Sequence, residues 1–491
     1  MTATYTATLP PLPSHEGRAV ALDDILAARD ARVARQQAML AQGGVLLSLT
    51  LVAPGAVKRS PLLDAIFAAA LAALRPLVDD ARARIEAVDD SGHHALYLLD
   101  GEARDWKTRM LALENRAPLA RLWDIDIIDR DGVAISRRDL GLPPRRCLLC
   151  DDDAKTCARA RRHSIDDLNA DIARRYRLHQ QAEHIGAAMR QALITEATLT
   201  PKAGLVDASS NGGHHDMTLA HFLASADAIT PYLAACAARG MTFAADAASP
   251  TILAAIRPIG IQAEAAMLAA TGGVNTHKGA IFAFGLTAAA LGKNLAASGS
   301  ATLAQTLADI RAISADLVAE QGAGDSAGQR AYRQHHITGA RGAAADGYRL
   351  ISAHALPAYQ HILSASDSER HALLAALVTL YAANDDTTTI ARVGLDGLRA
   401  HREWAKRLLA DEATLMDEDR LSTAIAAYGR DCATRRLSAG GSADLLALTA
   451  YFGRHFPTSL PTTEARPAAH TADNPNGIPA VPLMHNQKGT A

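Results

Sequence analysis

The chain has 491 residues, which exceeds what one hydrophobic core usually holds and favours two domains. Hydrophobic residues make up 49% of the sequence and aromatic residues only 4%, so the cores consist of Ala, Leu, Ile and Val in long helix-forming runs, and an all-β protein is disfavoured. The formal net charge of −2 provides no overall basic field for binding nucleic acid.

The sequence also argues against a membrane or secreted protein. Its longest apolar runs, residues 65–74 and 280–291, are shorter than the roughly 20 residues that cross a bilayer. The N-terminus, MTATYTATLPPLP, lacks the basic and then apolar pattern of a secretory signal. We therefore expect a cytoplasmic protein without nucleic-acid or membrane partners, whose five cysteines are reduced.

Residues 17–178 predict an α+β domain, preceded by a disordered N-terminus of residues 1–16. Helices are expected over 22–42, 62–77 and 103–114, and strands over 45–52, 95–99 and 119–129. Between the first strand and the next helix, Lys58, Arg59 and Ser60 form a basic turn at a helix N-terminus, which suits a phosphate group. A solvated turn explains these three residues equally well.

The strand predicted over 119–129 carries two carboxylates. Alternation places Asp124 and Asp126 on one face and Trp123, Ile125 and Ile127 on the other. Because like charges on one face are unfavourable unless a cation lies between them, the pair predicts a Mg²⁺ site that also takes substrate phosphates. Nucleotidyltransferases use Asp-x-Asp on a strand in this way, but edge strands also carry such pairs without function.

Three cysteines and a histidine follow within one arginine-rich loop. Cys147-x-x-Cys150, Cys157 and His163 offer thiolate and imidazole ligands, the set that suits tetrahedral Zn²⁺. Buried free thiols are the competing interpretation, and a redox pair is less favoured because no thioredoxin-like βαβ pattern surrounds the motif. The neighbouring arginines would face an acidic carrier protein, a polyphosphate or only solvent.

Three segments of this domain resemble the apo-citrate lyase phosphoribosyl-dephospho-CoA transferases. They are PGAVK at 54–58, RLWDID at 121–126 and SRRDLGLPPRRCLLC at 136–150, and the resemblance covers nearly all of residues 17–170. It implies a nucleotidyltransferase-like domain that transfers phosphoribosyl-dephospho-CoA to a serine of the citrate lyase acyl carrier protein and releases pyrophosphate. It also adds Arg121 to the expected nucleotide-binding residues, although the residue before it is Ala120 where the family usually has Gly.

Residues 179–460 predict a second, all-α domain, followed by a disordered tail of residues 461–491. A helix without Pro or Gly before Gly186 begins near Ile165, so we expect a helical connection between the domains. Beyond it the segments are rich in Ala and Leu at helical spacing, and they end at Gly, Pro or capping residues. The tail is rich in Pro, Thr, Ala, His and Asn.

Four loops of this domain carry chemically reactive side chains. They are residues 196–216, 271–279 with Glu264 before it, 335–342 and 384–388. In the second, TGGVNTHKG, the start of a helix bears an amide, a hydroxyl, an imidazole and an ammonium group, which suits a phosphorylated ligand; simple helix capping explains such a turn as well. We expect the four loops to line one pocket.

All four loops are similar to segments of the triphosphoribosyl-dephospho-CoA synthases, as is SAGGSAD at 438–444. Departures occur at Ala203, where the family commonly has Pro, and in the segment 392–394. The resemblance implies that the ribose 2′-hydroxyl of 3′-dephospho-CoA attacks C1′ of the ATP ribose and that adenine leaves. Such chemistry needs a proton acceptor, negative charge near an oxocarbenium-like centre, and cations for the triphosphate.

The expected catalytic residues of this second domain are Asp207, Glu264, His277 and Asp386, in addition to Asp124 and Asp126 of the first. Ligand-binding roles are expected for Lys202, His215, Asn275, Thr276, Lys278 and Arg341. The sequence thus predicts a bifunctional enzyme that makes the citrate lyase prosthetic-group precursor from ATP and 3′-dephospho-CoA and attaches it to the carrier protein. The matching steps for malonate decarboxylase, and a zinc-bearing nucleotide-binding scaffold without turnover, are the alternatives.

Overall fold

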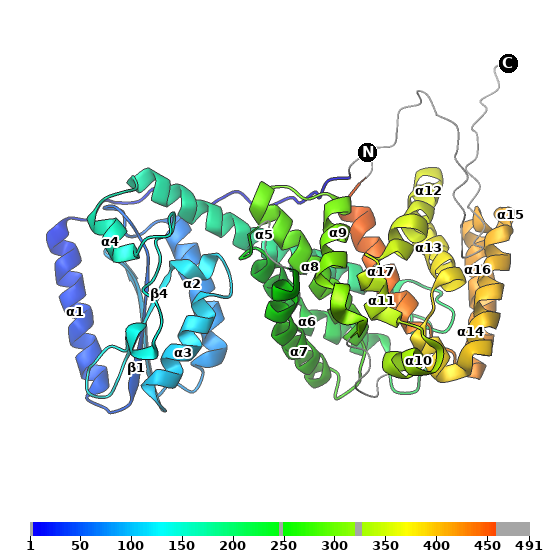
Figure 1. Ribbon diagram of the computed structural model, residues 1–491, viewed down its shortest axis with the longest axis horizontal. Helices are drawn as coiled ribbons and strands as arrows, with labels where there is room; N and C mark the ends of the chain where they lie inside the picture. The colour runs from blue at the N-terminus through cyan, green and yellow to red at the C-terminus, as the bar shows by residue number, and fades with distance from the viewer. Residues whose placement is uncertain (1–2, 245–248, 320–326, 458–491) are drawn as a thin grey trace, which may run out of the picture. The chain divides into compact units, whose positions relative to one another are not determined.

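The computed structural model describes residues 3–244, 249–319 and 327–457, and the chain divides into two compact units (Figure 1). Residues 8–181 form the N-terminal unit, whereas residues from 182 onward, together with the first seven, form the C-terminal unit. One continuous helix, α5 (Ile165–Thr198), contributes residues to both units. The predicted boundary at residue 178 lies within this helix.

The N-terminal unit contains a four-stranded antiparallel sheet in the order β2-β3-β1-β4. Its strands are β1 (Val45–Leu51), β2 (Ala83–Asp89), β3 (Gly92–Leu99) and β4 (Trp123–Ile128). The sequence predicted three of them but not β2, an edge strand that pairs with β3 alone. With arginine and glutamate alternating with small or apolar residues, β2 is only half-buried and gives a weak strand signal.

Helices cover both faces of this sheet (Figure 1). On one face α2 (Pro61–Leu74) and α3 (Ala103–Glu114) pack against inward residues of β1, β3 and β4 and form the main core. On the other face α1 (Leu22–Leu40) buries only Met39, beside Leu46, Leu96 and Leu98. The shorter helical segments are η1 (Arg75–Leu77), η2 (Leu119–Leu122), η3 (Arg138–Leu140) and α4 (Ala154–Arg159).

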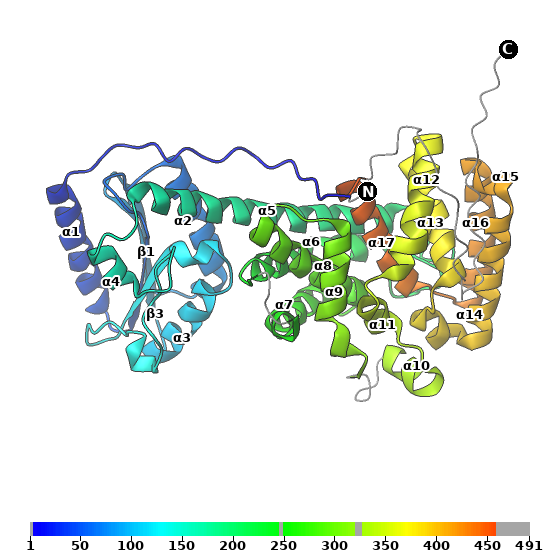
Figure 2. The same cartoon turned by 45° about the horizontal axis from the view of Figure 1, so that its top comes forward.

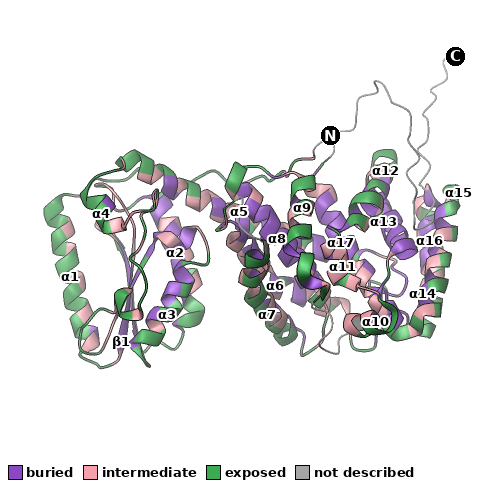
Figure 3. Cartoon of the chain, viewed as in Figure 1, coloured by how far each residue is buried: buried purple, intermediate pink, exposed green. Residues whose placement is uncertain are grey.

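The apolar residues expected to bury α1 are largely exposed. Leu22 is 69% exposed and Leu26 46% exposed, and most of the helix is exposed in Figure 3. The physical reason is that α1 contacts the sheet near its C-terminal end, where Met39 lies, so its first turns have no apolar partner within this unit.

Apart from an isolated bridge between Thr4 and Thr302, the described part of the C-terminal unit is helical. After α5 come α6 (Leu219–Gly240), α7 (Ser249–Ala270), α8 (Lys278–Ser298), α9 (Leu303–Ile313), η4 (Ala315–Leu317), α10 (Ala327–His335) and α11 (Gly339–Ala345). Then follow η6 (Ile351–Ala355), α12 (Leu356–Ser366), α13 (Glu369–Ala383), α14 (Thr387–Ala410), α15 (Glu412–Leu415), α16 (Glu418–Arg435) and α17 (Gly440–His455).

The buried helix α13 and the closely packed pair α6 and α8 organise this unit. Helix α13 packs against α12, α14, α16 and α17, as Figure 2 shows, and almost its entire length is buried. Helices α6 and α8 approach closely at two glycines: a Cβ atom at Gly240 would lie 2.1 Å from the Ala289 carbonyl oxygen, and one at Gly292 would lie 2.2 Å from that of Ala237. Only glycine permits this close contact between the C-terminal part of α6 and the middle of α8.

The first described residues belong to the C-terminal unit, which differs from the expectation of a disordered N-terminus over 1–16. The backbone N–H of Tyr5 donates to the Ala301 carbonyl at 2.8 Å, and that of Thr6 donates to the His455 carbonyl at 2.9 Å. The Tyr5 ring packs on Phe456. The segment is therefore ordered by carbonyl groups at the ends of helices, a partnership between distant residues that local composition does not reveal. The expected disordered tail, 461–491, lies outside the described residues.

Two helices are long and apolar enough to cross a membrane by length and composition, Pro250–Ala270 and Lys278–Ser298. Neither was expected from the sequence, because polar or charged residues interrupt both helices and leave only shorter uninterrupted apolar runs. Within the second helix, 78% of the most apolar 18-residue window is buried in the protein, as expected for the core helix α8 of a helical unit.

Candidate functional site

The loops predicted to line one pocket of the C-terminal unit are connected by hydrogen bonds. His214 Nε2 lies 2.9 Å from Ser438 Oγ, and the Ser438 carbonyl accepts a hydrogen bond from Thr389 Oγ1 at 2.9 Å. Gly339, which begins α11, lies against Thr387. The loops at 196–216 and 384–388 therefore meet at the segment 438–444, in which no site residue was predicted, and the loop at 335–342 contacts Thr387.

Asp386 and Asp207 are both buried and both saturated with hydrogen bonds. Asp386 caps α14 by accepting from the N–H groups of Thr388 and Thr389, and its second oxygen accepts from Ser442 N at 2.8 Å and Ser442 Oγ at 3.0 Å. One Asp207 oxygen accepts from Ser209 N, Ser209 Oγ and Ser210 N, and the other accepts from Lys202 N at 2.9 Å. Both carboxylates hold loops in shape and have little capacity left to accept a substrate proton.

Lys202 forms a buried ion pair with Glu196. Its Nζ donates to Glu196 Oε1 and to the Glu196 carbonyl, both at 2.6 Å, and the two side chains are 2% and 5% exposed. Burial raises the pKa of Glu196, and the attraction of Lys202 opposes that shift. Removing either partner would leave a buried charge uncompensated.

His277 occupies the N-cap of α8 and is held neutral. Its Nδ1 lies 2.7 Å from Ser225 Oγ, and its ring meets Phe222 edge to face. Burial, with a smaller contribution from Lys202, lowers the pKa of His277 to about 3. At pH 7 only about one ring in 10,000 would then carry a second proton, so His277 is poorly suited to protonate adenine and better suited to orient a ligand as a neutral group.

Three buried polar atoms, two of them in this loop and one on Tyr348, have no hydrogen-bond partner among the described residues. They are Thr276 Oγ1, His277 Nε2 and the hydroxyl of Tyr348. An unsatisfied buried polar group costs about 1–3 kcal/mol, and proteins tolerate such groups mainly where a ligand or water completes them. Asn275 instead uses its Oδ1 locally and accepts from Lys278 N at 3.3 Å.

Asp444 of α17 lies against the first turn of α8. A Cβ atom at Gly279 would lie 2.0 Å from Asp444 Oδ2, so residue 279 must be glycine for the carboxylate to approach. Burial raises the pKa of Asp444 well above its usual range, and the negative charges of Glu196 and Asp386 raise it further. The helix N-terminus that we expected to bind phosphate therefore faces a carboxylate that gains by accepting a proton.

The remaining predicted residues lie nearer the surface. Lys278 pairs with Glu264, and the two side chains are 57% and 31% exposed. Arg341 is half-buried and donates from Nη1 to the Leu317 carbonyl at 3.5 Å, whereas His215 is exposed and its neighbour His214 is buried.

In the N-terminal unit, Asp124 and Asp126 share the sheet face that carries α1, as the alternation predicted. Asp124 pairs with Thr50 of β1, which pairs in turn with His94 of β3, and Asp126 pairs with Ser48. Burial, followed by repulsion from Arg29, lowers the pKa of Arg32 of α1, and Asp126 and Asp124 lie close enough to oppose this shift. Partial burial, and then the charge of Asp124, raise the pKa of Asp126. This polar patch would accept a cation between the carboxylates.

Arginines surround the start of β4. Arg145 Nη1 donates to Asp124 Oδ1 at 2.8 Å, and its Nη2 donates to the carbonyls of Arg121 and Trp123, both at 2.8 Å. Arg121 donates to the Arg146 carbonyl at 2.8 Å, and burial, followed by repulsion from Arg145, lowers its pKa to about 10. These arginines and Arg137 line a cleft of about 470 Å³ that suits polyphosphate or an acidic protein surface.

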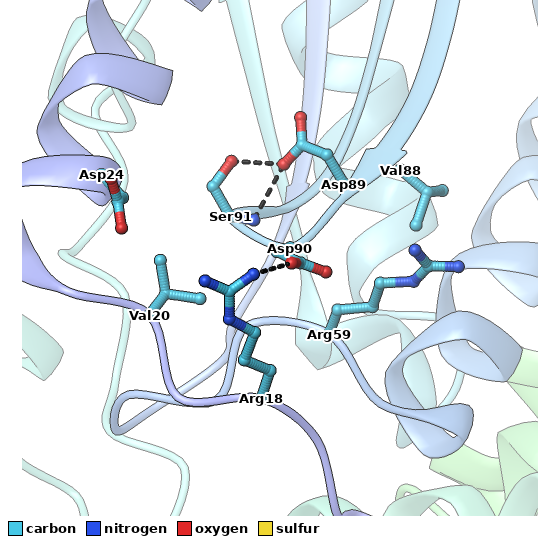
Figure 4. Close-up of a pocket in the computed structure, with 8 residues that line it drawn as sticks. All are labelled: Arg18, Val20, Asp24, Arg59, Val88, Asp89, Asp90 and Ser91. Atoms are coloured by element: carbon cyan, nitrogen blue, oxygen red, sulfur yellow. Dashed lines mark hydrogen bonds and ion pairs between the residues drawn. The ribbon is translucent and has the colours of Figure 1, made fainter.

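The predicted basic turn at 58–60 lies elsewhere in this unit. Lys58 Nζ donates to the Ala53 carbonyl at 2.6 Å, and Ser60 caps α2. Arg59 lines a hollow of about 620 Å³ together with Arg18 and three aspartates, Asp24, Asp89 and Asp90 (Figure 4). Because three carboxylates share this hollow with two arginines, one of which pairs with Asp90, it is less suited to phosphate than the arginine-lined cleft.

The predicted zinc ligands lie together. The candidate ligand atoms of Cys147, Cys150, Cys157 and His163 all lie within 4.8 Å of one another, and no other group of this kind occurs among the described residues. Burial alone would raise the pKa of the Cys147 thiol, but hydrogen bonds from the backbone N–H groups of Leu149 and Cys150 outweigh it and lower the pKa.

Comparison with known proteins assigns both units to families. Residues 20–179 match the family described as apo-citrate lyase phosphoribosyl-dephospho-CoA transferase, CitX, and residues 182–457 match ATP:dephospho-CoA triphosphoribosyl transferase, CitG. The protein CitXG of Haemophilus influenzae is 40% identical over 89% of this chain and 97% of its own length. The chain belongs to the fused CitX–CitG family.

Relatives of the CitG region alone include two proteins named 2-(5''-triphosphoribosyl)-3'-dephosphocoenzyme-A synthase. The one from Haemophilus ducreyi is 41% identical over 62% of this chain and 98% of its own length, and the one from Pectobacterium atrosepticum is 41% identical over 58% and 94%. Membership of the CitX–CitG family makes this chain a multifunctional transferase of citrate lyase prosthetic-group synthesis.

Sequence reasoning missed the polar partners that complete the CitX and CitG sites. In the CitG region these partners are Glu196, Ser225 and Asp444. In the CitX region the partner is Arg145, which was predicted only as part of a group of arginines facing an acidic protein, a polyphosphate or solvent. The similarity of the segment 438–444 to the synthases was the available signal for Asp444.

The low pKa of His277 predicts how the stability of the CitG region depends on pH. Between its unfolded pKa of 6.5 and its folded value of about 3, the unfolded chain binds a proton that the folded chain excludes. The free energy of unfolding therefore decreases as pH falls, and His277 contributes up to about 1.4 kcal/mol per pH unit to this decrease. The melting temperature should therefore decrease more between pH 7 and pH 5 in the wild type than in His277→Gln. An equal decrease in both proteins would contradict a neutral, buried His277.

Proposed function

We propose that the CitG region joins ATP to 3′-dephospho-CoA and that the CitX region transfers the product to the citrate lyase acyl carrier protein, both in the cytoplasm. The observation that carries the first activity is the group of unpartnered buried atoms at Thr276, His277 and Tyr348, next to the proton-accepting carboxylate of Asp444. A site that leaves these groups unsatisfied without a ligand is suited to binding a polar substrate.

In the first reaction the 2′-hydroxyl oxygen of 3′-dephospho-CoA bonds to C1′ of the ATP ribose as the bond from C1′ to adenine breaks. The hydroxyl loses its proton, adenine gains one, and the triphosphate stays on the transferred ribose. Asp444 is the proposed proton acceptor, because Asp207 and Asp386 are saturated with hydrogen bonds. Burial and the nearby carboxylates raise its pKa, so its ionised form is a stronger base than that of an exposed aspartate.

The other predicted residues of the CitG region receive binding roles in this proposal. His277 acts as a neutral hydrogen-bonding group, and Glu264, paired with Lys278, supplies negative charge at the rim near the oxocarbenium-like centre. The groups proposed to contact the triphosphate or ribose are His215, Asn275, Thr276, Lys278 and Arg341, whereas Lys202, predicted to bind the ligand, acts through its buried ion pair with Glu196. Asp207 and Asp386 act by holding their loops.

In the second reaction a serine oxygen of the carrier protein loses its proton and bonds to the phosphorus attached to the transferred ribose, as the bond from that phosphorus to the bridging oxygen breaks and pyrophosphate leaves. The CitX region would then be a nucleotidyltransferase-like domain. Asp124 and Asp126 fit Mg²⁺, since they share one sheet face and burial, followed by the charge of Asp124, raises the pKa of Asp126; the ion would neutralise phosphate charge when bound. Arg121 and Arg145 are proposed to hold the pyrophosphate portion, and Lys58 and Arg59 to bind more distant phosphates.

The first activity has a direct test. The full chain, incubated with ATP, Mg²⁺ and 3′-dephospho-CoA, should release free adenine together with a heavier CoA derivative, both measured by chromatography. Adenine should appear only when 3′-dephospho-CoA is present. If ATP binds but no adenine is released, the proposal fails and a nucleotide-binding scaffold becomes the better description. Offering the product to citrate lyase and malonate decarboxylase carrier proteins separately would then identify the acceptor.

A further inference from the structure

We propose that Cys147, Cys150, Cys157 and His163 bind one structural zinc ion, and that this ion positions Arg145 beside Asp124. The first support is geometric. In a tetrahedral site with zinc–sulfur bonds of about 2.3 Å, two sulfurs lie about 3.8 Å apart. Cys150 Sγ and Cys157 Sγ are separated by 3.8 Å, and the four ligand atoms lie within 4.8 Å of one another.

The alternatives explain the cluster less well. A disulfide requires sulfurs about 2.05 Å apart, and all three cysteines are free. Ordinary buried thiols would lie in an apolar core, but none of these cysteines belongs to the two cores of the sheet, and Cys147 and Cys150 are only half-buried. In addition, the buried Nε2 of His163 has no hydrogen-bond partner in the described part of the chain, as expected for a nitrogen that completes a metal site.

The ligand set indicates a structural ion. Three thiolates and one imidazole from the protein fill a tetrahedral shell and leave no position for water or substrate. They also join three short chain segments: the Cys147–Cys150 turn, the short helix α4 that carries Cys157, and the turn at His163. Apart from the ligands, these segments are held together by backbone hydrogen bonds such as that from Cys147 N to the Asp152 carbonyl and by the Arg162–Asp152 ion pair. From residue 129 to α5, regular structure is limited to η3 and α4, so a metal crosslink would supply order that a hydrophobic core does not.

The ordered loop reaches the proposed CitX site directly. Arg145 precedes the first ligand by two residues and contacts Asp124 Oδ1 and the Arg121 and Trp123 carbonyls. Arg146 lies between Arg145 and Cys147 in the sequence, and its carbonyl accepts a hydrogen bond from Arg121. The carbonyl of Leu148, inside the Cys-x-x-Cys turn, accepts from Arg175 Nη2 at 3.1 Å. Holding the Cys147–Cys150 turn in place therefore holds the Arg145 guanidinium against the Asp124 carboxylate. The role of this contact in carrier loading rests on the proposed function.

The binding site is tested by metal analysis of the full chain purified without chelators. About one zinc per chain is expected in the wild type and in the control Cys236→Ala, whose cysteine is buried in the C-terminal unit. Cys147→Ser/Cys150→Ser should contain less than about a tenth of that amount. Absence of stoichiometric zinc from the wild type, or its retention by the double variant, would overturn the site.

The positioning role is tested by separating the two activities. Losing zinc in Cys147→Ser/Cys150→Ser should lower carrier loading by about 10- to 100-fold, the usual cost of disturbing groups that orient a site, and leave adenine release unchanged. Arg145→Lys should keep its zinc and show a similar loss of loading, because lysine cannot contact the carboxylate and two carbonyls at once. Full loading by either variant would overturn the positioning role. If the zinc-replete wild type loads no carrier, the proposed CitX reaction is wrong, while the metal content still decides the zinc site.

Discussion

The double substitution Asp124→Asn/Asp126→Asn is expected to lower carrier-protein loading by at least about 100-fold and to leave adenine release unchanged. Asparagine keeps the shape of both side chains but removes the two charges that would hold Mg²⁺ against substrate phosphates. Because Asp124 and Asp126 lie in the N-terminal unit and the proposed synthase residues lie in the other, the effects should separate. Loading is measured as the mass gained by the carrier protein when chemically complete precursor is supplied.

A matched control removes two charges elsewhere in the same unit. Asp105→Asn/Asp131→Asn changes one exposed residue of α3 and one exposed residue of the turn after β4. It should load carrier protein at the wild-type rate. If the Asp124→Asn/Asp126→Asn variant also loads at that rate, the assignment of a nucleotidyl-transfer site to this sheet face is wrong. Zinc content, which depends on the neighbouring loop, should remain stoichiometric in both variants.

The regular spacing of apolar residues in the sequence predicted the strands and helices that bury one face. The alternation from Trp123 to Ile128 predicted β4, and its burial pattern confirms that Asp124 and Asp126 share the more exposed side. Close ligand spacing in the chain likewise predicted that Cys147, Cys150 and Cys157 would meet His163. Both are properties of a short segment, so pairing with distant residues was not needed to infer them.

Features set by distant partners were not predictable in this way. The edge strand β2 lacks a strong apolar pattern and is formed by pairing with β3. Residues 3–7 are extended because carbonyl groups near residues 301 and 455 accept their N–H groups. The helical pattern of α1 implied burial, but Met39 is its only buried residue, with Leu40 partly buried beside it. In each case tertiary contacts overrode local composition.

The same distinction explains which roles in the CitG region were predicted poorly. A carboxylate in a polar loop has the same appearance in sequence whether it accepts a substrate proton or caps a helix. Asp386 precedes Thr387 and Thr388, a pattern that also predicts an N-cap, and the structure shows it capping α14. Asp444, inside a helix and 165 residues beyond Gly279, approaches the α8 N-terminus only through packing of α17 on α8.

Asp444→Asn is expected to lower adenine release by about 100- to 1,000-fold while leaving carrier loading from supplied precursor intact. The amide matches the carboxyl group in shape and can still accept a hydrogen bond at the α8 N-terminus, but it cannot take up the proton of the 2′-hydroxyl. Release of adenine under saturating ATP and 3′-dephospho-CoA measures this step. Wild-type adenine release by the variant would remove Asp444 from the proposed reaction.

Thermal stability separates a proton acceptor from a structural residue. Burial and nearby carboxylates raise the pKa of Asp444, so its ionised form is disfavoured in the folded protein, and Asp444→Asn should leave the melting temperature at pH 7.5 unchanged or raise it. Asp386→Asn should instead lower the melting temperature, because an amide N–H₂ would replace an oxygen that accepts hydrogen bonds from a helix N-terminus or from Ser442. If Asp444→Asn also melts earlier than the wild type, its lost activity reflects damage to the fold, and the proton-acceptor role would have to pass to another carboxylate such as Glu264.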